Sequence, residues 1–159
     1  MKKFTIALAA LAISGCSGGR ADGELDPGKW KQTATIRSIE VPGAPEQVQK
    51  MLQGMTGKAT SSESCMTPAQ AKVGVRSLAS QMQQGDCSSE GFKAAGGKIS
   101  GKLTCKVGGK EMAMSVDGTY EPAKIAMKAD METEHPAAPG GKAVIHMDMV
   151  AERVGDCAK

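Results

Sequence analysis

The chain has 159 residues, a formal net charge of +3 at pH 7, two histidines and only four aromatic residues. A nucleic-acid-binding surface usually combines a strongly basic patch with stacking aromatic rings, and this composition argues against one. Two histidines are also a poor inventory for acid–base or nucleophilic chemistry, so we expect neither a nucleic-acid-binding protein nor an enzyme.

The first sixteen residues have the pattern of an export signal. Lys2 and Lys3 precede an apolar run over residues 4–13, which is too short to span a bilayer, since a spanning helix needs about 20 apolar residues. The run leads into Ile13-Ser14-Gly15-Cys16, which resembles the lipobox of bacterial lipoproteins. We therefore predict a signal peptide over residues 1–15 and lipidation of Cys16.

The residues after this cysteine suggest where the protein resides. Ser17 follows Cys16, and by resemblance to enterobacterial sorting rules a serine here favours the outer membrane over the inner one. We expect an outer-membrane lipoprotein facing the periplasm, whose membrane partner is reached through acyl chains such as palmitate, each buried CH₂ contributing about 0.8 kcal/mol. Residues 16–27 are small and polar and predict a flexible tether, followed by one periplasmic domain over residues 28–159.

Four cysteines remain after Cys16. An even number of cysteines in an oxidising compartment predicts two disulfides, and no C-x-x-C spacing favours a zinc or thioredoxin-like site. Sequence alone permits three connectivities. These cysteines are Cys65, Cys87, Cys105 and Cys157.

The first part of this domain predicts a strand, an ambiguous segment, a second strand and a helix. Residues 28–39 alternate between apolar and polar side chains, residues 46–57 have helical spacing weakened by glycines, and residues 60–66 read as a strand. Thr67, Pro68 and Gln70 form a capping signature, and we predict a helix over residues 67–83 with Gly85 beyond its end.

The rest of the chain predicts strands joined by tight turns. Alternating segments at 90–95, 98–107, 110–120, 123–134 and 142–153 are separated by two Gly-Gly turns and two Pro-containing loops. One face is apolar and the other is charged and solvated. The predicted fold is α+β and mainly β, an antiparallel meander covered by one helix, or curled toward a half-barrel.

The strand register suggests how the cysteines pair. A two-residue turn at Gly96-Gly97 places Ser88 opposite Cys105, so Cys87 lies beside Cys105 at one end of the sheet. A helix over residues 67–83 is about 25 Å long and carries the chain away from Cys65. The last strand returns toward Cys65 and is followed by Cys157. We therefore favour the pairs Cys87–Cys105 and Cys65–Cys157.

Several short motifs, taken in order, resemble one bacterial family, the domain of unknown function 3617. The resemblance implies exported, often lipidated, small domains with cysteines, and it implies no activity, cofactor or catalytic residue. The motifs are Gly28-Lys29-Trp30, Cys65-Met66-Thr67-Pro68, Cys87, Leu103-Thr104-Cys105, Gly118-Thr119-Tyr120 and Val154-Gly155-Asp156-Cys157.

Two motifs could suggest catalysis or phosphate binding. His146 and Asp148 alternate on the polar side of the last strand, where a His–Asp couple could orient a base, but no convincing nucleophile accompanies them. His135 lies in a loop of Pro and Gly, which favours a solvated side chain. Residues 96–103 fail as a phosphate loop because Leu103 replaces the required hydroxyl residue.

Methionines on three neighbouring strands are the most distinctive side chains. They could pack an aromatic-poor core, bind Cu(I) through their thioethers, or line a pocket for an apolar ligand. They are Met112, Met114, Met127, Met131, Met147 and Met149. We predict an envelope lipoprotein without a cofactor that is a non-enzymatic binding or structural module for a protein or an apolar ligand; the alternative is a Cu(I)-binding periplasmic protein.

Overall fold

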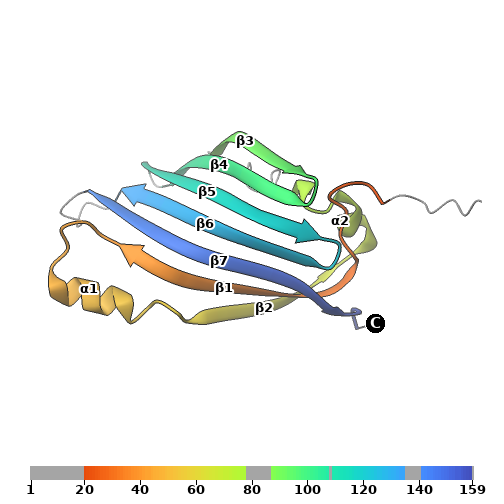
Figure 1. Cartoon of the computed structure of the whole chain (residues 1–159), viewed down its shortest axis with the longest axis horizontal. Helices are drawn as coiled ribbons and strands as arrows, with labels where there is room; N and C mark the ends of the chain where they lie inside the picture. The colour runs from red at the N-terminus through yellow and green to blue at the C-terminus, as the bar shows by residue number, and fades with distance from the viewer. Residues whose placement is uncertain (1–19, 78–86, 108, 135–140, 159) are drawn as a thin grey trace, which may run out of the picture.

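The computed structural model describes residues 20–77, 87–107, 109–134 and 141–158, which form one open sheet of seven antiparallel strands (Figure 1). The strands follow the order β2-β1-β7-β6-β5-β4-β3. The five strands from β3 to β7 are a meander, and β1 then pairs with β7, the last strand. The strands are β1 (Gly28–Glu40), β2 (Ala59–Met66), β3 (Cys87–Ala95), β4 (Lys98–Val107), β5 (Lys110–Glu121), β6 (Lys124–Glu134) and β7 (Lys142–Gly155).

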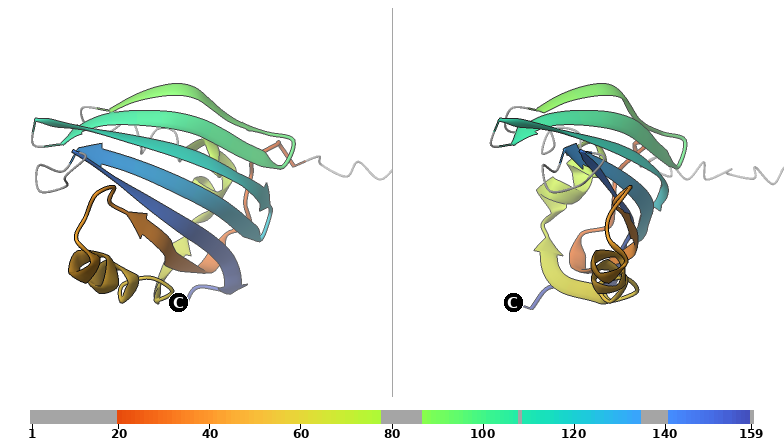
Figure 2. Two further views of the ribbon diagram at one scale, coloured as in Figure 1. Left: turned by 60° about the vertical axis from the view of Figure 1, so that its left-hand side comes forward. Right: turned by 90° about the vertical axis from the view of Figure 1, so that its left-hand side faces the viewer.

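The sheet curves without closing, and Figure 2 shows α2 (Pro68–Val73) inside the curve. We call the side that faces α2 the concave face and the other side the convex face. The second helix, α1 (Glu46–Gln53), lies beside the far end of β1. The predicted mainly β, antiparallel meander is confirmed, and among the residues described it has β2 and β3 as its two free edges.

The helix α2 is shorter than its sequence predicts. Its start agrees with the prediction, because the Thr67 side chain accepts a hydrogen bond from the Gln70 amide and the Gln70 side chain accepts one from the Thr67 amide. It ends at Val73, because Gly74 adopts a φ of +56° and lies tightly against Gly23. The last part of the predicted helix, residues 78–83, lies outside the described residues.

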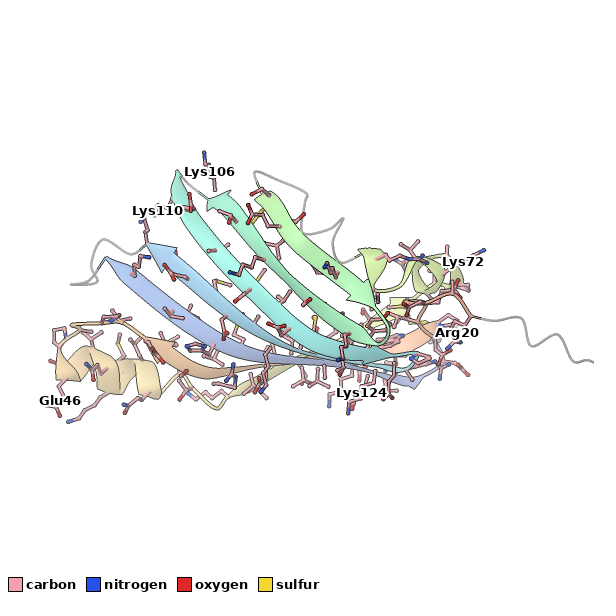
Figure 3. All side chains as sticks on the ribbon, turned by 45° about the horizontal axis from the view of Figure 1, so that its top comes forward. Arg20, Glu46, Lys72, Lys106, Lys110 and Lys124 are labelled. Atoms are coloured by element: carbon pink, nitrogen blue, oxygen red, sulfur yellow. A yellow bond between two sulfur atoms is a disulfide. The ribbon has the colours of Figure 1, made fainter. Side chains whose placement is uncertain are left out.

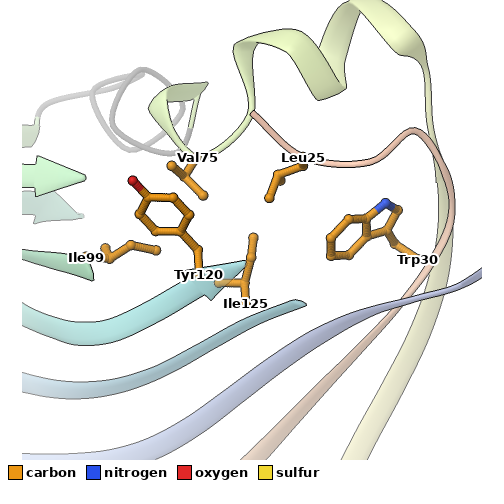
Figure 4. Close-up of a cluster of buried hydrophobic side chains, with 6 residues drawn as sticks. All are labelled: Leu25, Trp30, Val75, Ile99, Tyr120 and Ile125. Carbon is orange, nitrogen blue, oxygen red and sulfur yellow. The ribbon is translucent and has the colours of Figure 1, made fainter. Parts of the chain in front are cut away.

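The main core cluster lies at the end of the sheet near α2 (Figure 4). Strand alternation turns the apolar side chains of neighbouring strands toward the concave face, and the turn after α2 adds Val75. Trp30, Val75 and Ile99 are almost completely buried there. The cluster consists of Leu25, Trp30, Val75, Ile99, Tyr120 and Ile125.

Residues 20–27, which we call the N-terminal strap, correct the predicted tether. The strap packs against the domain: Leu25 is buried in the core cluster, its amide donates to the carbonyl of Ala71 at 2.9 Å, and the Asp26 amide donates to the carbonyl of Pro122 at 2.7 Å. Composition predicted flexibility because these residues are small and polar, but one apolar side chain and the backbone hydrogen bonds hold the segment. The folded domain therefore begins before Gly28.

The structure contains the two favoured disulfides, Cys87–Cys105 and Cys65–Cys157. Within the β3–β4 pair the predicted register was wrong by one residue. Cys87, not Ser88, lies opposite Cys105, because a bulge between Glu90 and Lys93 shifts the pairing. Each disulfide fastens one edge strand, since Cys87 belongs to β3 and Cys65 to β2.

Candidate functional site

The six candidate methionines lie on the same side of the sheet, as the alternation predicts. Met114 is directly opposite Met131 in the β5–β6 pair, and Met127 is directly opposite Met149 in the β6–β7 pair. Opposite residues on antiparallel strands have their Cβ atoms about 4.5–5.5 Å apart, so their thioethers can touch. All six are partly buried, which means that the concave face is only partly covered at these positions.

A cavity of about 440 Å³ lies on the concave face between the sheet and the N-terminal strap. This volume is within the range of small-molecule sites, about 300–1,000 Å³. Four strands form its floor: β1, β2, β6 and β7. Its lining is mostly apolar and includes Leu25, Trp30, Ala34, Met66, Ile125, Met127, Met149 and Ala151. Two of the six candidate methionines, Met127 and Met149, therefore belong to it.

Side-chain size explains why the sheet is hollow here. Ala34 lies directly opposite Met149, and Ala151 lies directly opposite Gln32 and Ile125, so short side chains stand beside long ones. At one end Trp30 is fixed, because its Nε1 donates a hydrogen bond to the carbonyl of Asp26 at 2.9 Å.

The opposite end of the cavity is polar and reaches the edge of the sheet. Gln32, Thr60 and Ser62 line it there and are exposed. The cavity thus has an apolar interior and a polar rim, which suits a ligand with an apolar body and a polar end.

The convex face carries a larger hollow of about 780 Å³, but its chemistry is different. Lys98, Asp117 and Lys128 line it, and it is open to solvent. Figure 3 shows charged side chains distributed over the whole domain. A ligand in the convex hollow would stay in contact with water, because charged side chains of both signs line it and it is open. The concave cavity is therefore the better candidate site.

The structure does not form the expected couple of His146 and Asp148. His146 lies on the convex face, where its Nδ1 is 2.5 Å from Oδ1 of Asp130 and its Nε2 is 3.5 Å from Oε1 of Glu40. Asp148 instead pairs with Arg37, whose Nε lies 2.9 Å from its Oδ1. The reason is the β1–β7 pairing, which brings Arg37 and Glu40 to this surface. His135 lies outside the described residues.

The histidine and the methionines are therefore on opposite faces of the sheet. Over the parts of the chain that the structure describes, no three His, Cys, Asp or Glu side chains gather as a metal site would require. A Cu(I) site would depend on thioethers alone, at the Met114–Met131 or Met127–Met149 pair.

The chain matches the model of the family described as "Protein of unknown function (DUF3617)" over residues 25–157. The chain belongs to this family. The match begins at Leu25, within the N-terminal strap, and ends at Cys157, the partner of Cys65, so it spans the folded domain. No curated protein and no solved structure matches the chain. In the described part of this family member, no helix has the length and apolar character to cross a membrane.

Proposed function

We propose that this protein is an envelope lipoprotein, lipidated at Cys16 on the periplasmic face of the outer membrane, whose domain binds an apolar ligand without catalysing a reaction. The observation that carries the proposal is the cavity of about 440 Å³ with an apolar lining on the concave face. The lipobox-like sequence before Cys16 supports the anchor, and the disulfides agree with an oxidising compartment.

Met127 and Met149 make this cavity adaptable. Methionine has an unbranched, polarisable side chain that fits surfaces of varied shape. Burial of apolar ligand surface contributes roughly 25 cal/mol per Å², so a chain-like ligand gains affinity along the length of the cavity. The polar rim at Gln32, Thr60 and Ser62 would keep a polar ligand end hydrated.

Ligand binding is tested with a fluorescent fatty acid and the Cys16→Ser form of the protein. Ala34→Phe places a ring in the cavity and should weaken probe binding about tenfold, corresponding to about 1.4 kcal/mol. Ala113→Phe is the matched control, since Ala113 is also exposed on a strand but lies on the convex face. Equal affinity for the two variants, or no binding by the parent, would contradict the proposed site.

The anchor is tested by metabolic labelling with palmitate and fractionation of the two membranes. We expect label on the parent, none on Cys16→Ser, and movement toward the inner membrane for Ser17→Asp. A chain labelled equally with and without Cys16 would refute lipidation at this residue, independently of the result for the cavity.

A Cu(I)-binding function is the second candidate, and the direct opposition of Met114 to Met131 favours it. Competition with a Cu(I) chelator gives the affinity. Replacing both with Leu preserves volume and should abolish binding if the site is there, whereas Leu at the exposed Met51 and Met55 of the α1 region should not. Unchanged Cu(I) affinity after the first replacement excludes this pair as the site.

A further inference from the structure

The strand β2 is a free edge of the sheet, and it is unusually open. Within the part of the chain that the structure describes it pairs only with β1, and every residue from Ala59 to Cys65 is exposed. The outer side of an edge strand presents backbone N–H and C=O groups that another strand can pair with. Among the described residues, no hydrogen bond given by the structure joins these groups to another part of the chain.

The other edge, β3, has the features that normally prevent such pairing. Its ladder with β4 is broken by a bulge between Glu90 and Lys93, where Gly91 has a φ of +63°. By contrast, β2 pairs without interruption from Ala59 to Met66 and contains no proline. Its one charge, Glu63, is occupied by Lys29 of its own chain, whose Nζ lies 2.6 Å away.

The strand β2 also buries almost nothing of itself in the domain. Its concave side chains Thr60, Ser62 and Ser64 are exposed and short. The β1 ladder and the Cys65–Cys157 disulfide hold it in an extended conformation. A strand fixed in this way is preorganised to accept a partner.

We propose that β2 pairs antiparallel with β2 of a second copy of this chain, with Ser62 opposite its own copy. A twofold axis perpendicular to the sheet keeps the concave faces of both copies on one side of the joined sheet. Each residue of β2 then lies opposite a residue of β2 in the second copy. Around Ser62, Glu63 lies opposite Ser61 and Ser64 lies opposite Thr60. Of the two neighbouring symmetric registers, the one centred on Glu63 would place the two Glu63 carboxylates opposite each other, which is unfavourable. The one centred on Ser61 would pair only residues 59–63 of the strand, whereas centring on Ser62 pairs residues 59–65.

This pairing would also complete the wall of the cavity. Thr60 and Ser62 line the polar end of the cavity on the concave face, at the edge of the sheet. In the dimer Ser62 and Ser64 of the second copy lie directly opposite Ser62 and Thr60 on the same face. The floor of each cavity then continues into the partner, and the dimer itself does not depend on any bound ligand.

The test measures the mass of the Cys16→Ser protein by light scattering and native mass spectrometry over a range of concentrations. We expect a reversible dimer. Ser62→Lys places two lysines opposite each other and should raise the dimer dissociation constant by up to about fivefold, since an unfavourable cross-strand pair costs up to about 1 kcal/mol. Ser88→Lys is the control, because Ser88 is an exposed serine on the other edge strand.

Charge exchange tests the register. Mixing Ser62→Lys with Ser62→Glu should restore a dimer that contains one chain of each kind. A parent protein that stays monomeric at every concentration overturns the proposal. Strands of other proteins would then be the partners to test for β2. A dimer that Ser62→Lys leaves unchanged overturns it as well. Circular dichroism and an intact disulfide mass show that each variant is folded.

Discussion

The phenol of Tyr120 donates a hydrogen bond of 2.5 Å to Oδ1 of Asp22, which is 98 residues earlier in the chain. The other oxygen of Asp22 accepts a hydrogen bond of 2.8 Å from the amide of Gly96. These two bonds fasten the N-terminal strap to β5 and to the β3–β4 turn. They stabilise the charged form of the carboxylate, so the Tyr120 hydroxyl and the Gly96 amide lower the pKa of Asp22.

Asp22→Asn should change how stability depends on pH. Because the folded-state pKa is lowered, the contribution of Asp22 is present above the unfolded carboxyl pKa and is lost as pH falls through the folded value. We expect the variant to melt at a lower temperature than the parent at pH 7, and the difference to shrink toward acid pH. Asp117→Asn, an exposed carboxylate on the convex face, is the control. A pH-independent difference would contradict this account.

Gly74→Ala should displace the N-terminal strap. A Cβ at this position would lie 1.9 Å from the carbonyl oxygen of Gly23, and the φ of +56° is itself strained for alanine. Gly57→Ala separates the two effects, because Gly57 has a φ of +74° and open space around it. We expect Gly57→Ala to cost about 1 kcal/mol of unfolding free energy and Gly74→Ala to cost roughly 1–3 kcal/mol more. Equal denaturant midpoints would show that the strap is not tightly packed there.

Removal of the two disulfides should have unequal effects. Cys65–Cys157 closes a loop with a sequence separation of 92 residues, and Cys87–Cys105 closes one of 18. The chain-entropy model gives about 4.6 and about 3.2 kcal/mol for loops of these lengths. Paired Cys→Ser variants, unfolded in urea, should show the larger loss for Cys65–Cys157. The reverse order would mean that the disulfides act mainly on the folded state.

Trp30 belongs to both the core cluster and the cavity lining, so replacing it should affect both stability and ligand binding. It is 1 % exposed and donates from Nε1 to the carbonyl of Asp26. Trp30→Ala should reduce the unfolding free energy by roughly 3–5 kcal/mol. Trp30→Phe retains most of the apolar volume and should cost less, about 1–3 kcal/mol for the unpaired carbonyl. As the chain contains one tryptophan, its fluorescence should also respond to a ligand in the cavity, with Ala34→Phe as the variant that weakens the response.

Most of the strand order in the sheet could be predicted, because it follows from local sequence patterns. The Gly96-Gly97 turn and the alternation of β4, β5 and β6 place Met114 and Met131 on one face without knowledge of distant contacts. The pairing of β1 with β7 could not be found in this way, since nothing local to Arg37 indicates that Asp148 lies beside it. For the same reason the sequence suggested a partner for His146 on its own strand, whereas the structure supplies Asp130 and Glu40.

The N-terminal strap shows another limit of sequence reasoning. Asp22 and Leu25 lie in a segment that is mostly polar and contains glycine, and such segments are usually flexible. Their order comes from single partners far away in sequence, Tyr120 and Ala71. The cavity was likewise not predictable in its position, because it depends on Ala34 and Ala151 meeting longer side chains across strands.

The position of β1 also sets the order in which the sheet can assemble. The meander from β3 to β6 and the β1–β2 pair can each form from neighbouring segments, but β1 joins the rest of the sheet only through β7. Gly155 lies opposite Lys29 in this pair, although the two residues are far apart in the sequence. The two halves therefore stay separate until β7 has formed and paired with β1, and the Cys65–Cys157 bond closes only at this final step.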